Sequence, residues 1–200
     1  MTSITWTATD ASGNSASAVQ TIEVRDVEAP VVVVPNDITV NATSPSGALV
    51  NYSVTASDNV GVVSLVCTPA SGSVFGIGYK EINCVARDAA GNSASGEFGV
   101  KVLSAHEQIL NLVTYIGSLH LPNGVANPLV NQLSAADSNG SSGQACKKMD
   151  DFVHMVSVKD GSLSSEQSSF LVNEAYRIER VLGCAGVPAP ASSRGLGLRG

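Results

Sequence analysis

The sequence predicts an all-β sandwich followed by a small all-α helical bundle. Short segments rich in β-branched residues alternate with turn residues as far as residue 103, which is typical of a sandwich. From Ser104 onward the spacing of apolar residues changes from two to about 3.6, which indicates helices. An internal repeat with an offset of 78 residues also has the size of one small β-sandwich domain.

The repeat relates residues 4–17 to residues 82–95, and nine of the fourteen aligned positions are identical. We therefore expect residues 1–26 to be the C-terminal hairpin of a preceding, truncated repeat, and residues 27–103 to be a complete one. On this interpretation the chain is the C-terminal fragment of a larger protein, covalently continuous with upstream domains.

Turn signals divide residues 27–103 into six expected strands. Pro, Gly, Asn and Asp residues separate runs that alternate in polarity or are rich in β-branched side chains. The expected strands are residues 31–34, 38–41, 49–56, 62–68, 79–87 and 98–103.

Several motifs in the same segment resemble the HYR (hyalin repeat) domain family. They occur in order over essentially all of residues 27–103, at residues 29–30, 34–35, 37–40, 55–61, 67–73, 82–84 and 86–95. The resemblance implies an immunoglobulin-like sandwich of a kind that occurs in tandem in extracellular proteins and is associated with adhesion. It extends to residues 2–25, where Trp6 stands at the position of Cys84. We therefore expect no disulfide in that copy, and a buried Trp6 in its place.

The helical part contains clear start and stop signals. Ser104 with Glu107, and Ser164 with Gln167, have the spacing of capping boxes. A break at residues 121–124 ends the first helix. The second is expected to start at Asn127, with Pro128 at its first helical position. The third is expected over residues 144–158, after a polar loop at residues 137–143. Gly183 is expected to terminate the fourth.

These signals predict a bundle of about four helices over residues 104–185. Residues 186–200 are rich in Pro, Ala, Ser and Gly, and we expect them to be disordered. The bundle also resembles the FIMAH-type helical module found at the C-termini of secreted bacterial proteins, through residues 119–124, 145–146, 152–153 and 178–184. This resemblance implies little about activity.

Four cysteines allow three disulfide pairings. Cys67 and Cys84 both lie in the sandwich, and the HYR resemblance implies that their strands are neighbours. Cys146 and Cys184 would meet if the last two helices are antiparallel. Free thiols and zinc are the alternatives, although the sequence has no Cys-x-x-Cys and no histidine at ligand spacing. Structural disulfides would place the chain outside the cell, secreted or at the cell surface.

The charge balance excludes some classes of partner. Eleven Lys and Arg against seventeen Asp and Glu give a net charge of −6, so the chain lacks the basic face that nucleic-acid binding requires. The same balance argues against docking to anionic lipid. No apolar run approaches the length of a membrane span.

The chain offers few candidate catalytic or metal-binding residues. His106, His120 and His154 have no nucleophile motif near them, so we expect no catalytic residue. The oxygens of Asp58-Asn59 and of Asp88 with Asn92 could ligate calcium. The sequence favours Asx turns instead, because Asp10 and Asn14 repeat the second pair and no carboxylate cluster is visible. No metal site and no cofactor are therefore assigned.

The resulting prediction is a non-catalytic extracellular structural or adhesion module with an unidentified protein or polysaccharide partner. The alternative is an accessory module of a secreted hydrolase that binds polysaccharide or calcium. Trp6, Tyr52 and Tyr79 could stack on sugar rings, but packing is the default for scarce aromatic residues. A complete small enzyme is a third possibility, and the absence of an acid/base pair argues against it.

Overall fold

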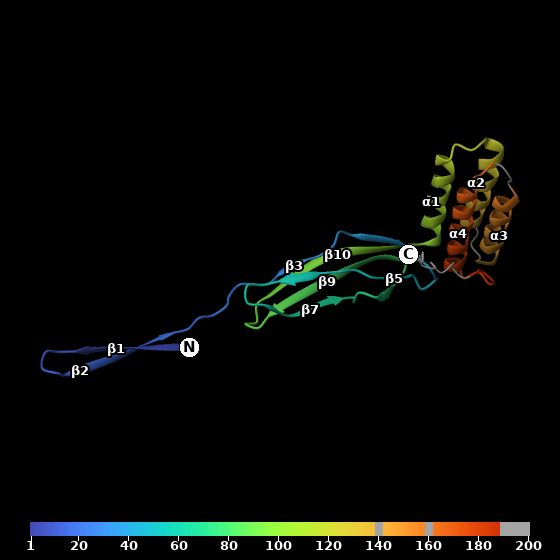
Figure 1. Ribbon diagram of the computed structural model, residues 1–200. Coiled ribbons are helices and arrows are strands. Elements are labelled where there is room, and N and C mark those ends of the chain that lie inside the picture. The colour runs from blue at the N-terminus through green and yellow to red at the C-terminus, as the bar shows by residue number, and fades with distance from the viewer. Residues whose placement is uncertain (139–141, 159–161, 189–200) are drawn as a thin grey trace, which may run out of the picture. The chain divides into compact units, whose positions relative to one another are not determined.

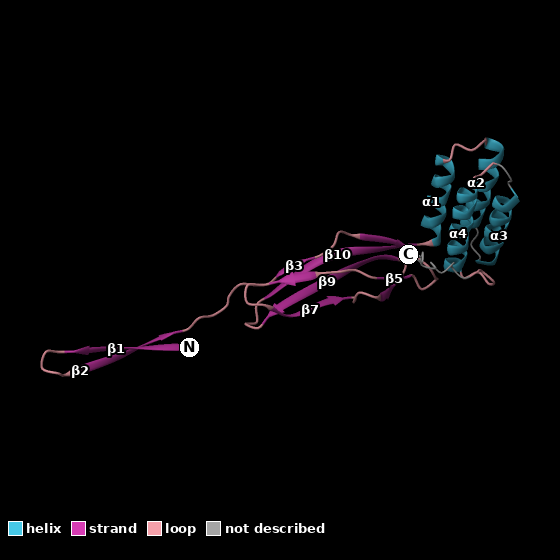
Figure 2. Cartoon of the chain, in the orientation of Figure 1, coloured by secondary structure: helices cyan, strands magenta, loops and turns pink. Residues whose placement is uncertain are grey.

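A computed structural model describes residues 1–138, 142–158 and 162–188 (Figure 1). It confirms the fold class, since ten strands precede Ser104 and four helices follow it in the described residues (Figure 2). From residue 189 on, the tail expected to be disordered lies outside the described residues, and so do residues 139–141 of the expected polar loop. None of the described helices is long and apolar enough to cross a membrane.

The chain divides into two compact units. The first comprises Met1–Val34, Val54–Thr68 and Asn83–Gly96. The second comprises Pro35–Ser53, Pro69–Ile82 and the chain from Glu97 onward. The domain boundaries expected from the sequence, at residues 26, 103 and 185, stay a prediction.

Strands β1 (Thr2–Thr9) and β2 (Ser15–Ile22) form an antiparallel two-stranded sheet. Its register places Trp6 opposite Ala18. The expectation that Trp6 is buried is wrong, because 61% of this residue is exposed. Within the described residues β1 pairs with β2 alone, so no second sheet covers the indole. Its Nε1 donates a hydrogen bond to Gln20 Oε1.

Four strands within residues 38–103 form the main sheet, in the order β4 (Ile38–Asn41), β10 (Ser93–Leu103), β9 (Gly78–Asp88) and β7 (Val62–Thr68). Strand β4 runs parallel to β10, and β7 runs antiparallel to β9. Two small antiparallel sheets accompany it: β3 (Val31–Val33) with β6 (Thr55–Ser57), and β5 (Ala48–Val50) with β8 (Ser73–Phe75). Alternate β9 residues are fully buried, as a half-buried strand requires: Ile82, Cys84 and Ala86.

The single strand expected at residues 49–56 is two strands, β5 and β6, and β8 was not expected. The backbone between β5 and β6 bonds to a loop instead of a strand. Tyr52 N donates to Ser71 Oγ (2.8 Å), and the Tyr52 hydroxyl donates to the carbonyl of Pro69. At Tyr52 these bonds take the place of sheet pairing. The local alternation of polarity in the sequence does not reveal this interruption.

The helices are α1 (Ala105–Ser118), α2 (Asn123–Ser138), α3 (Ser142–Val158) and α4 (Ser165–Leu182). Both capping boxes are confirmed, with Ser104 and Glu107 at the start of α1 and Ser164 and Gln167 at the start of α4. Gly183 ends α4 in the left-handed conformation (φ 77°), which a glycine adopts without a Cβ penalty.

Helix α2 begins at Asn123 and not at Asn127, so Pro128 lies inside the helix and not at its first position. The carbonyl of Pro122 starts the helix earlier, since it accepts bonds from Val125 N (2.8 Å) and Ala126 N (3.0 Å). Burial of Val125 among the apolar side chains of the bundle favours this earlier start. Similarly, α3 begins two residues before the position expected.

The four helices lie side by side in one bundle (Figure 1). They pack around one apolar core. Its fully buried members come from all four helices: Ile116, Leu129, Leu133, Met149, Phe152, Leu171, Ala175 and Ile178. The heptad-like spacing in each helix places these residues on one face, and their burial drives the packing of the bundle.

In the second unit, β10 leads into α1 with only Ser104 between them. Gln108 of α1 is 2% exposed, and its Nε2 donates to the carbonyls of Ala42 (3.2 Å) and Leu103 (2.9 Å). Its Oε1 accepts from Arg177 Nε of α4 (3.0 Å), so one buried amide ties two helices to the strand ends.

An ion pair also joins β10 to α1. Lys101 Nζ lies 2.8 Å from Glu107 Oε1. This contact with Lys101, followed by the hydrogen bond from Ser104 N, lowers the pKa of Glu107 to about 2. Glu107 therefore stays ionised while it caps α1 and contacts the end of β10.

Gln108→Leu is expected to lower the free energy of unfolding by about 2 kcal/mol, because it removes hydrogen bonds to the carbonyls of Ala42 and Leu103 and the partner of Arg177 Nε. Denaturant titration would measure the change. Gln144→Leu, at an exposed position of α3, is the matched control and should change stability by less than about 0.5 kcal/mol. Equal stability of the two variants would show that the Gln108 bonds do not hold the strand ends to the helices.

Candidate functional site

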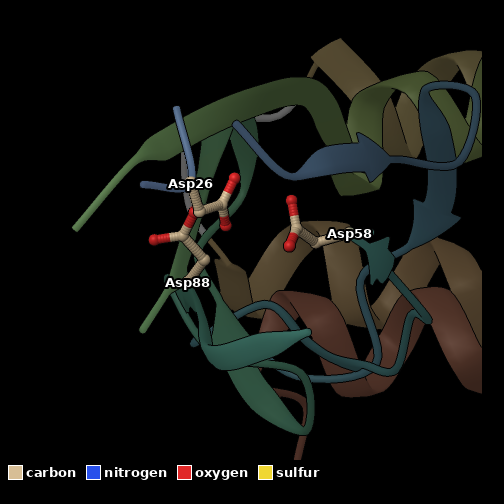
Figure 3. Close-up of side chains that lie close together, drawn as sticks. All are labelled: Asp26, Asp58 and Asp88. Atoms are coloured by element: carbon tan, nitrogen blue, oxygen red, sulfur yellow. The ribbon is translucent and has the colours of Figure 1, made fainter. Parts of the chain in front are cut away.

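Three aspartates of the first unit, Asp26, Asp58 and Asp88, lie close together (Figure 3). One carboxylate oxygen of each lies within 4.8 Å of the corresponding atoms of the other two. Asp26 belongs to the segment between β2 and β3, Asp58 follows β6, and Asp88 is the last residue of β9. The cluster is invisible in the sequence because its members are about thirty positions apart.

Strand pairing explains why these three positions meet. The antiparallel pair β3 and β6 places Val31 opposite Ser57, so the segment before β3 lies beside Asp58. The pair β7 and β9 places Val62 opposite Asp88, and the short turn from Asp58 to the start of β7 connects the two pairs. The sheet register therefore brings the cluster together.

Asp26 and Asp58 each bond to backbone amides through one oxygen only. Asp58 Oδ1 accepts from Val60 N (2.9 Å) and Gly61 N (3.0 Å), and Asp26 Oδ1 accepts from Glu28 N (3.1 Å). The Oδ2 atoms of Asp26 and Asp58 are inaccessible to solvent and have no hydrogen-bond partner. An unpartnered buried carboxylate oxygen is costly in free energy unless a ligand satisfies it.

Asp88 is almost fully buried, with 4% exposed. Its Oδ1 accepts from Gly91 N (2.7 Å) and Asn92 N (2.8 Å), and its Oδ2 accepts from Asn92 Nδ2 (2.7 Å). Burial acts to raise the pKa of Asp88, but the hydrogen bonds from Asn92, Gly91 and Ala90 outweigh it, so the pKa lies below the ordinary value. Asp88 is therefore ionised at neutral pH.

The bonds of Asp88 and Asn92 confirm the predicted Asx turn, and the equivalent turn in the first hairpin has the same pattern. Asp10 Oδ1 accepts from Ser12 N (2.9 Å) and Asn14 N (2.8 Å), and Asp10 Oδ2 accepts from Asn14 Nδ2 (2.9 Å). Asp10 is exposed, however, and is not one of the clustered residues. The same turn thus occurs once with carboxylate neighbours and once without them.

The histidines do not form a catalytic arrangement among the described residues. His106 Nδ1 lies 2.6 Å from Asp137 Oδ1, a contact that joins α1 to α2 at the protein surface. Within the described residues, no serine, threonine or cysteine side chain donates a hydrogen bond to any of the three histidines, which is the contact that a catalytic triad requires.

The four cysteines form two disulfides. Cys67 and Cys84 are directly opposite on β7 and β9, with Cα atoms 4.0 Å apart. Cys146 near the start of α3 bonds to Cys184 after α4, with Cα atoms 5.6 Å apart. In this structure the four cysteines are structural residues, and none of them is a free thiol.

The aromatic candidates do not form a common platform. Trp6 (61% exposed) and Tyr79 (63% exposed) belong to different units. Tyr52 is partly buried, and its ring contacts Phe98 edge to face at a centroid distance of 5.0 Å. Tyr52 thus packs in the sandwich, as the default interpretation expected.

A buried glutamate that the sequence did not single out lies in the helical bundle. Glu179 of α4 is 2% exposed, and its Oε1 has no hydrogen-bond partner. Burial, and then the charge of Asp150, raise the pKa of Glu179 to about 7, while Arg180 acts in the opposite direction. Glu179 is a charged residue next to the buried Ile178, and the sequence alone gave no sign that its side chain is buried as well.

Glu179 makes the stability of the bundle depend on pH. The folded chain binds this proton more tightly than the unfolded chain, so the stabilisation is complete below about pH 4.5 and is lost as the pH rises through about 7. Glu179→Gln is expected to raise stability by about 2 kcal/mol at pH 8 and to change it little at pH 4.5. Thermal unfolding at both pH values would measure this. Glu166→Gln, exposed on the same helix, is the control; a pH-independent effect of Glu179→Gln would contradict the titration.

Comparison with known proteins covers the sandwich. Residues 25–102 match the HYR domain family. The chain is 36% identical over 108 residues to hyalin of Strongylocentrotus purpuratus, covering 51% of this chain and 9% of that protein. It is 37% identical over 108 residues to hyalin of Lytechinus variegatus, covering 51% of this chain and 20% of that protein.

A third relative is a sushi, von Willebrand factor type A, EGF and pentraxin domain-containing protein of Rattus norvegicus. It is 37% identical over 105 residues, covering 50% of this chain and 3% of that protein. The chain therefore spans at most a fifth of the length of these curated relatives. The HYR match and the two disulfides indicate an extracellular, adhesion-type module.

Proposed function

We propose that this chain is a non-catalytic structural and adhesive part of a secreted or cell-surface protein that continues in further domains upstream. The observation that carries this proposal is the HYR match over residues 25–102. The disulfide within that segment supports it, because a cross-strand bridge persists in an oxidising compartment. The partner is a protein or a polysaccharide outside the cell.

The connection between β10 and α1 supports a spacing role. A single residue, Ser104, separates strand from helix, and the buried Gln108 bonds to strand-end carbonyls and to Arg177 of α4. Such a connection transmits orientation better than a flexible linker, whose ends move independently. The proposed role of the helices is thus to present a second surface at a set angle to the strand ends. Membership of the FIMAH-type modules stays a prediction.

The test uses the complete protein in its source organism. Intact cells and culture medium are probed for the tagged protein, and attachment of the cells to surfaces is compared with that of cells whose protein lacks residues 27–103. The proposal predicts external protein, and weaker attachment after the deletion at equal secretion. Protein retained inside the cell, or unchanged attachment, would contradict it. Deletion of residues 1–26 alone is the matched control.

The alternative is polysaccharide binding, and one observation favours retaining it. The exposed Tyr79 ring lies at a hollow of about 300 Å³ that is also lined by Pro69, Val74, Phe75, Gly76, Ile77 and Lys80. A ring beside polar and apolar lining atoms suits a sugar face. If Tyr79→Ala abolished retention on a polysaccharide matrix while leaving the fold intact, this alternative would replace protein-mediated adhesion.

A further inference from the structure

We propose that Asp26, Asp58 and Asp88 form a calcium-binding site that fastens the segment before β3 to the loops of the sandwich. Figure 3 shows the carboxyl groups of Asp26 and Asp58 facing one another, with that of Asp88 beside Asp26. The proposal does not depend on adhesion, since it concerns the stability and geometry of the sandwich itself.

The separation of the three oxygens suits one calcium ion. Calcium binds carboxylate oxygens at about 2.3–2.6 Å, so two ligands on opposite sides of one ion lie up to about 5 Å apart. The three ligand atoms lie within 4.8 Å of one another. Three carboxylates supply three of the six to eight oxygens that calcium takes, and backbone carbonyls and water supply the rest.

A second, independent observation also points to a ligand. The Oδ2 atoms of Asp26 and Asp58 are fully shielded from solvent and accept no hydrogen bond, although their Oδ1 atoms are held by backbone amides. Backbone anchoring of Oδ1 leaves Oδ2 as the oxygen free to bind. Asp88, which is 4% exposed and the only buried residue of the three, adds a third carboxylate whose Oδ2 keeps a lone pair beyond its bond from Asn92.

Charge supports a cation over a neutral ligand. None of the ion pairs among the described residues involves these three aspartates, and the nearest arginine in sequence, Arg25, pairs with Glu23. Three carboxylates at this spacing repel one another, and a divalent cation removes that repulsion. Calcium suits the site better than magnesium, because ligands from three separate segments do not impose the regular octahedron that magnesium demands.

Calcium binding would act on the segment that joins the first hairpin to the sandwich. Asp26 lies in this segment, and its carbonyl also accepts a bond from Asn92 Nδ2 (3.5 Å). Calcium would hold Asp26 to Asp58 and to Asp88 at the end of β9, so the ion would fasten this segment to the sandwich. Arg25, with its side chain 72% exposed, is a protease site immediately beside the ligand.

Titration of the full chain with calcium chloride, followed by calorimetry, tests the proposal. One ion per chain is expected, with a dissociation constant of about 10⁻⁴–10⁻³ M. Asp58→Asn and Asp26→Asn each keep an oxygen for the backbone amides and remove the charge, and each should weaken binding at least about tenfold. Asp10→Asn, in the matching turn of the first hairpin, should bind as the unmodified chain does.

Two further readouts guard against a variant that fails to fold. With the unmodified chain, calcium should raise the unfolding temperature more than an equal concentration of magnesium does, and it should slow tryptic cleavage after Arg25 several-fold. The proposal is overturned if the folded, unmodified chain binds no calcium up to about 10 mM, or if folded Asp58→Asn and Asp26→Asn bind it as tightly as Asp10→Asn does.

Discussion

Replacement of Cys146 and Cys184 by alanine is expected to lower the free energy of unfolding of the helical bundle by about 4 kcal/mol. The two cysteines are 38 positions apart, and the bridge removes the corresponding loop entropy from the unfolded chain. The bridge also joins the start of α3 to the residue after the cap of α4, so its loss frees two helix ends together. Denaturant titration followed by circular dichroism would measure the change.

The second disulfide provides a matched comparison. Cys67 and Cys84 are 17 positions apart, so their replacement removes a smaller loop and should cost about 3 kcal/mol. The loss should appear in the β-sheet transition and leave the helical signal unchanged. A helical bundle that is equally stable with and without its bridge would show that α3 and α4 are held by apolar packing alone.

Phe152→Ala is expected to destabilise the bundle by about 4 kcal/mol, because it removes a large side chain and leaves a cavity. Phe152 of α3 is fully buried among the core residues that all four helices contribute. The same titration would measure the loss through the helical signal. If the variant does not fold, Phe152→Leu keeps most of the volume and should cost about 1–2 kcal/mol.

Phe170 offers the control for this substitution. It is 42% exposed on α4, and its ring contacts Tyr115 at a centroid distance of 4.5 Å. Phe170→Ala should therefore cost only about 1 kcal/mol. Similar losses from Phe152→Ala and Phe170→Ala would contradict the assignment of Phe152 to the centre of the core.

Local patterns in the sequence predicted those features that depend on neighbouring residues. The capping box at Ser104 and Glu107 needs only a three-residue spacing, and the left-handed Gly183 needs only the absence of a Cβ. The strand expected at residues 79–87 lies within β9, and its turn signals depend only on neighbouring residues.

Features that depend on distant partners were missed. Burial of Trp6 requires a second sheet, which the first hairpin lacks within the described residues. The start of α2 depends on a tertiary environment that buries Val125. Gln108 is buried because carbonyls and an arginine from other elements satisfy its amide, and polar residues otherwise favour the surface.

The carboxylate cluster shows the same limit at the candidate site. Each aspartate was visible as a residue of a turn or linker, and the Asx turn at Asp88 was expected from its spacing to Asn92. Their proximity follows from the registers of two strand pairs, which a single sequence does not specify. Nothing in the sequence indicated that one carboxylate oxygen of Asp26 and one of Asp58 would lack a hydrogen-bond partner.

The most direct test of the central claim, an extracellular scaffold of two disulfide-bonded parts, is peptide mapping of the protein isolated from its source organism. Free thiols are alkylated first, and linked peptides are then identified by mass spectrometry before and after reduction. The structure predicts two linked pairs, Cys67 with Cys84 and Cys146 with Cys184, and no alkylated cysteine. Four alkylated cysteines in the folded protein would contradict the extracellular assignment.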